Sequence, residues 1–290
     1  MHSRNLIFIL LCIFYMPQSW SQVGPEFDDN GTQNKPLWEL GAIGAAFNTP
    51  EYPGASQNQN NAIVAPYFVY RGEIFRVGDG SAARAVAVEK DWIEVDLSLD
   101  AGFNANSSED SVRAGMPDLD YVFEIGPQVR LKLFESGNSH SSKKTLSFKI
   151  QTRAAFSTDF GSIDHRGYVF HPELTYQQSG WLQEEDRLTL NLSPVWATEK
   201  LHDYFYQVDQ AFVTEQRALF DARSGYLGFE LSVGYGFDAT SAIRVFMGAA
   251  VDLYQGSVNE DSPLLTDLDT VSVAAGLIWR FTESQQKANY

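Results

Sequence analysis

Long segments in which apolar and polar residues alternate dominate this sequence. The clearest runs from Asp118 to Phe134, where every second residue from Leu119 to Leu133 is apolar and the residues between them are mostly polar. Successive residues of a strand point to opposite faces, so each such segment predicts a β-strand with one apolar and one mostly polar face. The same pattern recurs in segments 92–103, 145–156, 225–237, 243–253 and 269–281.

The length of these segments separates two ways of burying an apolar face. A soluble sandwich also alternates, but its strands average about 5–6 residues, whereas a tilted strand needs about 9–11 residues to cross a bilayer. Aromatic residues such as Tyr168, Trp196, Trp279 and Phe281 lie near the ends of the apolar faces, as in the girdles of membrane barrels. We therefore predict an all-β protein, an antiparallel transmembrane β-barrel of about 12 strands in the bacterial outer membrane.

The spacing of the segments predicts which ends of the barrel carry loops. An even strand number puts both termini in the periplasm, with short turns there and long loops outside. The long connections at 48–61, 104–117, 198–224 and 255–268 fall on the extracellular side in this scheme, and only the brief 79–82 link departs from it. The expected strands are 38–47, 62–71, 73–78, 83–89, 92–103, 118–134, 144–156, 166–178, 186–197, 225–237, 242–254 and 269–281.

The N-terminus resembles a secretory signal peptide. An apolar core from Leu6 to Tyr15 is too short to span a bilayer as a helix, and Ser19-Trp20-Ser21 resembles a cleavage site. Cys12 is the only cysteine, so we expect a mature chain without disulfides or thiolate metal sites. The expected organisation is a signal peptide at 1–21, a periplasmic leader at 22–37, the barrel at 38–281 and a C-terminal tail at 282–290.

The composition argues against several function classes. A net charge of −16 disfavours nucleic acid as a partner. No paired-His motif, Gly-rich phosphate loop or CxxC occurs, so we expect no cofactor and no metal site. The histidines beyond the predicted signal peptide are His140, His165, His171 and His202. An acid–His pair in the loops remains an alternative, but we expect no catalytic residues and no enzymatic activity.

The polar face of the strands is expected to line the barrel interior. The candidate lumen-lining residues are Glu94, Asp96, Glu124, Arg130, Lys149 and Arg153. They would form either a selectivity lining for a solute or a set of cross-strand ion pairs that fills a narrow barrel. A barrel of about twelve strands lies between filled and open barrels, so both interpretations stand.

Two loop features yield further expectations. The connection 198–224 carries much apolar surface, including Tyr204, Tyr206 and Phe220, and we expect it to fold into the lumen as a constriction or else to present a surface for a partner. The acidic extracellular loops would form a solvated rim, or would bridge to lipopolysaccharide phosphates through divalent cations. Outer-membrane lipid and lipopolysaccharide are therefore expected partners.

Short motifs spread along the chain carry a family resemblance. They are Glu51-Tyr52-Pro53-Gly54, Ala65-Pro66-Tyr67-Phe68-Val69-Tyr70, Asp118-Leu119-Asp120, Ser262-Pro263 and the ending Trp279-Arg280-Phe281. In this order and spacing the sequence resembles the MipA/OmpV family, the MltA-interacting proteins. The Pro–Gly pair predicts a turn, and Pro66 within a strand predicts a bulge or a strand start. The family-motif residues are Tyr52, Pro53, Gly54, Pro66, Tyr67, Tyr70, Asp120, Ser262, Pro263 and Phe281.

The resemblance implies an outer-membrane barrel and, in some members, an adaptor between a lytic murein transglycosylase and a murein synthase. We therefore expect a scaffold for enzymes of murein (peptidoglycan) synthesis and remodelling. A porin-like channel for small solutes and a surface adhesin are the alternatives. The sequence departs from the family pattern at its end, where nine residues follow Phe281.

Overall fold

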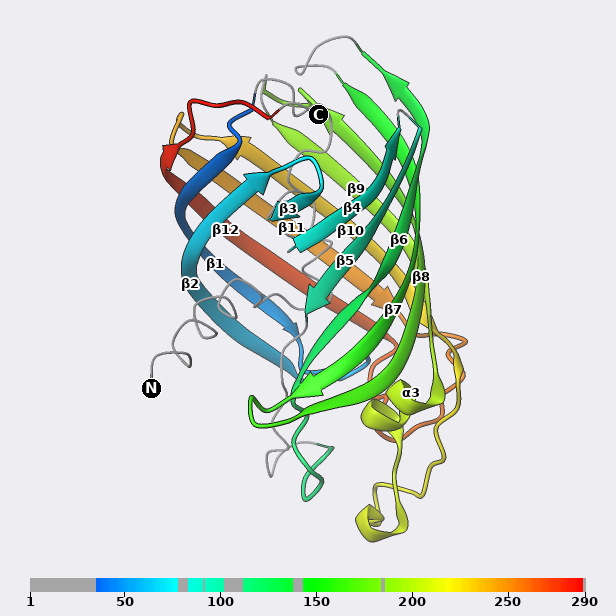
Figure 1. Ribbon diagram of the computed structural model, residues 1–290. Helices are drawn as coiled ribbons and strands as arrows, with labels where there is room; N and C mark the ends of the chain where they lie inside the picture. Colours follow the sequence, from blue (N-terminus) through cyan, green and yellow to red (C-terminus); the bar gives the residue numbers. More distant parts are fainter. Residues whose placement is uncertain are drawn as a thin grey trace.

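A closed antiparallel barrel of twelve strands accounts for most of the protein (Figure 1). The computed structural model describes residues 35–77, 83–90, 92–101, 112–137, 143–183 and 186–288. The predicted fold is confirmed, while the expected signal peptide at 1–21, leader residues 22–34, the 79–82 link and His140 lie outside the described residues. The strands are β1 (Trp38–Pro50), β2 (Asn58–Arg71), β3 (Phe75–Val77), β4 (Ala83–Lys90), β5 (Ile93–Ala101), β6 (Tyr121–Ser136), β7 (Lys144–Thr158), β8 (Ile163–Ser179), β9 (Arg187–Ala197), β10 (Gly225–Asp238), β11 (Ile243–Leu253) and β12 (Asp269–Glu283).

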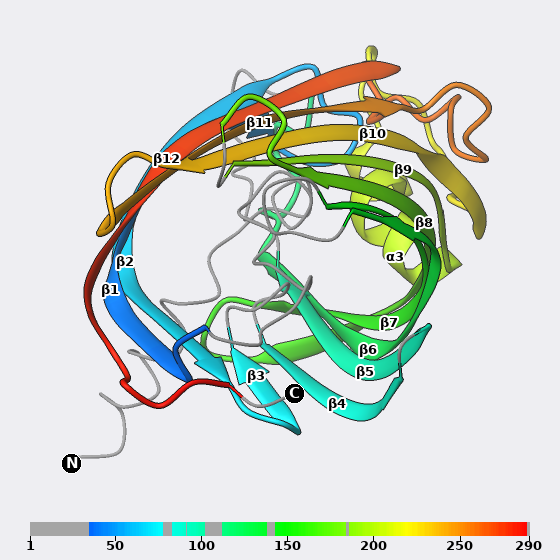
Figure 2. The ribbon, with the colours of Figure 1, turned by 90° about the horizontal axis from the view of Figure 1, so that it is seen from above.

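Each strand pairs with its neighbours in the chain, and β12 pairs with β1 to close the barrel (Figure 2). Short turns such as 72–74 and 239–242 lie at the end where the described chain begins and finishes, which we call the terminal end. Long connections at 51–57, 198–224 and 254–268 lie at the other, capped end. There the helix α3 (Glu199–Tyr206) packs beside β8. Among the described residues no helix is long and apolar enough to span a membrane.

The alternation seen in the sequence separates the outer and inner surfaces. On β12 the side chains of Val271, Val273 and Leu277 are 45–49% exposed on the outside, whereas the intervening Ser272 is 2% exposed. The prediction was wrong for Leu119, which we placed on the outer face. Leu119 precedes β6 and is buried in a cluster with Leu201 of α3, because the chain has already turned under the cap there.

The interior is not uniformly polar, contrary to our expectation. On β1, β2, β11 and β12 the inward side chains form a buried apolar cluster that includes Ile43, Phe47, Tyr67, Phe246 and Ile278. Buried charges also occur on these strands, such as Glu39 and Arg71. The six candidate lumen residues predicted from the sequence lie on the other side of the barrel, on β5, β6 and β7.

Strand β3 pairs with only Tyr70 and Arg71 of β2, so among the described residues the rest of that edge of β2 faces no strand. Pro66 lies in this stretch. We expected a bulge or a strand start there, but the β1–β2 register runs without a break through the pair Ala42–Pro66. A proline has no N–H to donate and is tolerated where the neighbouring edge makes no ladder, which removes the need for a bulge.

Candidate functional site: the charged interior and the capped mouth

The six candidate lumen residues all lie on inward-facing positions of β5, β6 and β7. Glu94, Asp96, Glu124, Lys149 and Arg153 are buried, and Arg130 is half-buried. The strand register places Glu94 opposite Arg130 and Glu173 opposite Lys149, while the two cations Arg130 and Lys149 also face each other. The interior of this side of the barrel therefore carries acidic and basic side chains close together.

Close ion pairs neutralise many of these charges. Arg153 Nε lies 3.0 Å from Glu124 Oε2, and Lys149 Nζ lies 2.6 Å from Glu173 Oε1. Thr175 also donates to Glu173 at 2.6 Å. Buried charges are stable only when they are paired and hydrogen-bonded, so these pairs hold adjacent strands in one arrangement.

A buried arginine on β3 was not found by sequence reasoning. Arg76 is fully buried, donates to the backbone oxygen of Gly72 at 3.2 Å, and lies 2.5 Å from Glu89 and 4.0 Å from Glu94. Strand β3 has three residues, too few for an alternation to appear. The apolar residues Ile74, Phe75 and Val77 were the only sequence signal for this strand, and they do not indicate that Arg76 is buried.

At the capped end, family-motif residues from distant parts of the sequence meet. Tyr52 donates its hydroxyl to the backbone oxygen of Leu264 at 2.7 Å, and Tyr206 donates to that of Pro53 at 3.0 Å. Ser262 closes the ring by donating to the backbone oxygen of Tyr206 at 2.8 Å. The first loop, the α3 segment and the last loop thus hold one another in place.

The turn at Tyr52-Pro53-Gly54 requires its glycine. Gly54 has φ +76°, and a Cβ there would lie 2.8 Å from the side chain of Leu265. Its backbone oxygen accepts hydrogen bonds from the amides of Thr266 and Asp267. Burial raises the pKa of the Tyr52 hydroxyl to about 12, so this residue stays a hydrogen-bond donor over the physiological range.

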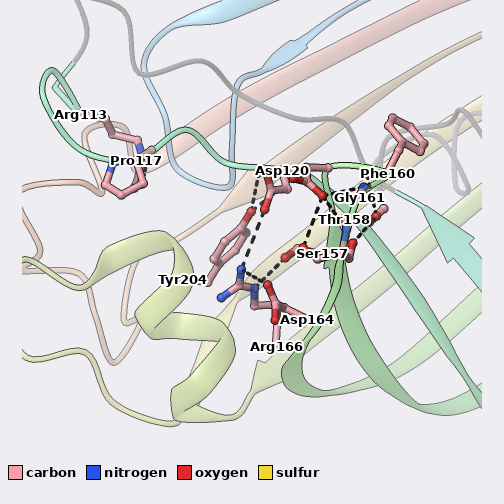
Figure 3. Close-up of polar contacts among 12 residues, drawn as sticks. Arg113, Pro117, Asp120, Ser157, Thr158, Phe160, Gly161, Asp164, Arg166 and Tyr204 are labelled. Atoms are coloured by element: carbon pink, nitrogen blue, oxygen red, sulfur yellow. Dashed lines mark hydrogen bonds and ion pairs between the residues drawn. The ribbon is translucent and has the colours of Figure 1, made fainter.

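A second set of contacts fixes α3 to the barrel rim (Figure 3). The guanidinium of Arg166 lies 4.3 Å from the ring centre of Tyr204, and its Nε donates to Ser157 at 2.7 Å. Ion pairs join Arg166 to Asp120 at 3.9 Å and to Asp164 at 3.5 Å. The amide of Asp120 donates to the Tyr204 hydroxyl at 2.6 Å. The motif residue Asp120 is therefore part of the cap.

The apolar side chains of loop 198–224 turn inward at the mouth of the barrel, as one of the two expectations had it. Leu201, Phe205 and Tyr206 of α3 share a buried cluster with Val122 and Val169 of the inner wall. Leu201 and Phe205 also line a cavity together with the lumen residues Glu124, Arg153 and His171.

His202, one of the histidines considered from the sequence, is fully buried in this cap. Its Nδ1 lies against the backbone oxygen of Arg223 and the side-chain amide of Asn259, while its Nε2 has no hydrogen-bond partner among the described residues. Burial lowers the pKa of His202 below its ordinary value. His165 contacts the rings of Phe156 and Tyr168. Neither contact forms an acid–His pair.

The remaining motif residues do not join the cap. Tyr67 lies in the inner apolar cluster, and Tyr70 sits near the terminal end, where its ring packs beside Gly72. Pro66 points outward, whereas Pro263 follows Ser262 within the cap loop. Phe281 is 58% exposed and contacts Trp279 edge to face. The resemblance thus marks several structural positions and not one pocket.

At the terminal end, the two ends of the described chain pair with each other. Pro36 forms a bridge with Lys287, and the amide of Leu37 donates to the oxygen of Gln286 at 2.8 Å. Arg71 donates to the oxygen of Pro36 at 3.0 Å and pairs with Glu39 at 2.7 Å. Strand β12 runs two residues past the expected barrel boundary at Phe281. We call residues 35–37 and 284–288 the terminal clamp.

The family model for the MltA-interacting protein MipA matches residues 41–281. The chain belongs to the MipA family. The match spans all twelve strands of the barrel except the ends of β1 and β12. A comparison with curated proteins finds no match.

Solved structures of several barrels are similar to this MipA-family chain. The outer-membrane expressed OmpT of Vibrio cholerae is 8% identical, with a TM-score of 0.36, over 84% of this chain and 96% of that one. The CymD monoaromatic hydrocarbon channel is 10% identical, with a TM-score of 0.33, over 93% and 94%. A FadL homologue of Pseudomonas aeruginosa is 9% identical, with a TM-score of 0.33, over 91% and 98%.

Proposed function

We propose that this protein is a non-enzymatic scaffold in the bacterial outer membrane, which holds a lytic murein transglycosylase, and through it a murein synthase, at its periplasmic face. The observation that carries the proposal is the MipA family match over residues 41–281, because the family is described by its interaction with MltA. The structure contributes the reason why the barrel suits such a role.

The outer surface supports the membrane location. Apolar side chains such as Leu231, Val233, Met247 and Val273 are exposed there, and a water-soluble protein rarely exposes so continuous an apolar surface. A closed barrel satisfies the backbone hydrogen bonds of nearly all strands, as a membrane requires. The terminal end then faces the periplasm, where murein enzymes work.

The terminal clamp supports a docking surface at that end. Its segments are held by backbone hydrogen bonds and by the buried Glu39–Arg71 pair. A partner that binds an ordered surface loses little conformational entropy. Residues 284–288 extend beyond the aromatic end of the strand, and the exposed side chains of Gln285, Gln286 and Lys287 are available to contact a periplasmic enzyme.

The interior supports a scaffold over an open channel. The carboxylates and cations of β6, β7 and β8 neutralise each other in pairs such as Glu124–Arg153 and Lys149–Glu173. Charges committed to buried pairs are costly to separate and are not available to attract a passing ion. We expect little conductance from the protein in planar bilayers, including after deletion of residues 200–222. A large, steady conductance would instead support the channel alternative.

Binding of a purified lytic murein transglycosylase to the full chain in lipid nanodiscs tests the proposal. The protein should retain the enzyme, and deletion of residues 284–290 should release it. The matched control is Asp261→Ala, which changes an exposed residue at the capped end and should leave binding unchanged. Each variant must first show the heat-dependent gel mobility of a folded barrel. Failure of the wild-type protein to retain the enzyme would reject the scaffold, whereas retention by the deletion variant would reject only the clamp as its docking surface.

A further inference from the structure

Two arginines and one aspartate form a cluster on the inner wall of the barrel at its terminal end. Asp238 of β10, Arg244 of β11 and Arg280 of β12 lie on three consecutive strands, which run side by side in Figure 2. Asp238 and Arg244 are direct register partners. Trp279 and Phe281, which flank Arg280, are exposed on the outer surface, so Arg280 points to the interior. The three charged side chains are half-buried at the mouth of the barrel.

The two arginines share a single carboxylate. Arg244 Nη1 donates to Asp238 Oδ1 at 3.1 Å, and Arg280 Nη2 donates to Asp238 Oδ2 at 3.2 Å. No other acidic side chain among the described residues pairs with either arginine. Two guanidinium groups and one carboxylate leave this cluster with one positive charge in excess.

The neighbouring charges at this end do not cancel the excess. Glu39 of β1 is committed to Arg71 of β2, with Oε1 2.7 Å from Nη1, and both side chains are buried. On the other side of the cluster, β9 begins with Arg187, which is a further cation. The excess therefore remains on Arg244 and Arg280, whose side chains are 24% and 23% exposed. Unlike the buried pairs of β6 to β8, these two cations are within reach of a solute.

Both guanidinium groups have donors left for a second acceptor. A guanidinium carries five N–H donors, and each arginine donates one of them to Asp238. Arg280 Nε is buried without a hydrogen-bond partner among the described residues. The Arg244 guanidinium lies over the backbone of Gly236, where a Cβ would be 3.4 Å from Nη2. Donors that are already held in place lose little conformational entropy when they bind a ligand.

We propose that Arg244 and Arg280 bind the carboxylate group of a small solute at the terminal end of the barrel. A carboxylate carries one negative charge and two acceptor oxygens, so it neutralises the excess and gives each guanidinium a second acceptor. A phosphate monoester carries about −1.5 to −2 charges at pH 7 and would leave the cluster negative, so the charge balance favours a carboxylate. The site lies on β10, β11 and β12 and is separate from the terminal clamp.

Saturation-transfer NMR of the full chain in deuterated detergent tests the proposal, with N-acetylglycine as the probe and neutral N-acetylglycinamide as its matched analogue. We expect saturable binding of the carboxylate and about tenfold weaker binding, or less, of the amide. Acetate should displace the probe at lower concentration than inorganic phosphate does. Arg244→Gln and Arg280→Gln should each weaken the carboxylate roughly tenfold to hundredfold, as for loss of a hydrogen bond between charged groups. Arg223→Gln, which changes an exposed arginine of the capped end, should leave the affinity unchanged.

Asp238→Asn separates ligand binding from a purely structural role, because the two predict opposite effects. The variant leaves two guanidinium groups without their shared carboxylate, so N-acetylglycine should bind severalfold more tightly. A cluster that only holds three strands together would instead bind more weakly once Asp238 is lost. Each variant must first show the heat-dependent gel mobility of a folded barrel. Absence of N-acetylglycine binding to the wild-type protein, equal binding of the amide, or weaker binding to folded Asp238→Asn overturns the proposal.

The source of the carboxylate is tested with the same variants. An acidic side chain of a murein enzyme carries the same group, and that source rests on the proposed function. Retention of a purified lytic murein transglycosylase in nanodiscs should be the same for Arg244→Gln as for the wild-type protein. Release of the enzyme by Arg244→Gln, but not by Arg223→Gln, would overturn the assignment to a small solute. Failure of the wild-type protein to retain the enzyme would reject the scaffold and leave the binding of N-acetylglycine as evidence for this site.

Discussion

The hydroxyl of Tyr206 offers the sharpest test of the interlocked cap. Tyr206 is fully buried, and its hydroxyl donates to the backbone oxygen of Pro53 at 3.0 Å, which joins α3 to the first loop. Tyr206→Phe removes that donor and leaves the carbonyl oxygen without it. Loss of one partner of a buried hydrogen bond costs about 1–3 kcal/mol. The ring and its packing are retained, so the loss concerns the hydrogen bond alone.

A cost of this size changes the population of the open cap. Since about 1.4 kcal/mol is a factor of ten, the fraction of molecules with α3 released should rise roughly 5- to 150-fold. Amide hydrogen exchange of residues 199–206 in nanodiscs measures that fraction, because exchange there requires release of the helix. Exchange of the strand amides of β7 should not change, since the barrel itself stays closed.

Tyr168→Phe is the matched control. Tyr168 is 52% exposed on the outer surface, and its hydroxyl makes no hydrogen bond within the described residues. Tyr168→Phe also removes a tyrosine hydroxyl, but one that has no hydrogen-bond partner among the described residues. It should therefore leave the amide exchange of α3 unchanged. The cap interpretation is refuted if Tyr206→Phe and Tyr168→Phe give the same exchange rates in residues 199–206.

Two further predictions concern the lumen pair and the buried histidine. Glu124→Gln removes the carboxylate that pairs with the buried Arg153, so the free energy of unfolding in urea should fall by about 3–5 kcal/mol. Adding Arg153→Met should recover most of this loss. An unchanged stability of the single variant would contradict this. Burial lowers the pKa of His202, so the released cap binds a proton near pH 6.5 while the closed cap does not. The stability of the closed cap is therefore complete above that pH and declines as pH falls below it, which protease cleavage within 198–224 should report as faster at pH 5.5 than at 7.5. The raised pKa of Asp203 acts in the opposite direction, so the acid effect must disappear in His202→Gln if His202 causes it.

The sequence alone was sufficient for the barrel because the information lies in neighbouring residues. Alternation along β6 and β12 shows which side chains face outward, and the lengths of the segments show how far each strand runs. Register within a hairpin follows from the same pattern, since a slip of one residue would turn every apolar side chain inward. The observed strand bounds accordingly differ from the predicted ones by only a few residues, and most at the start of β2.

The cap could not be predicted because its contacts join residues far apart in the chain. The hydrogen bond from Tyr52 to Leu264 spans 212 residues, and that from Tyr206 to Pro53 spans 153. The motifs were visible in the sequence, but nothing in their spacing says that they meet. Leu119 was misplaced for the same reason, because periodicity continues past the end of a strand while the chain changes direction.

Local alternation therefore determined that this chain forms a closed barrel with an apolar outside, because the two faces of a strand are set by adjacent residues. Only the tertiary structure decided which inward groups find partners. Glu124 meets Arg153 and Glu173 meets Lys149, whereas Asp252 comes opposite the hydroxyl of Thr270. Strand register brings those groups together. Contacts between side chains on different strands cannot be deduced from the order of residues along one strand.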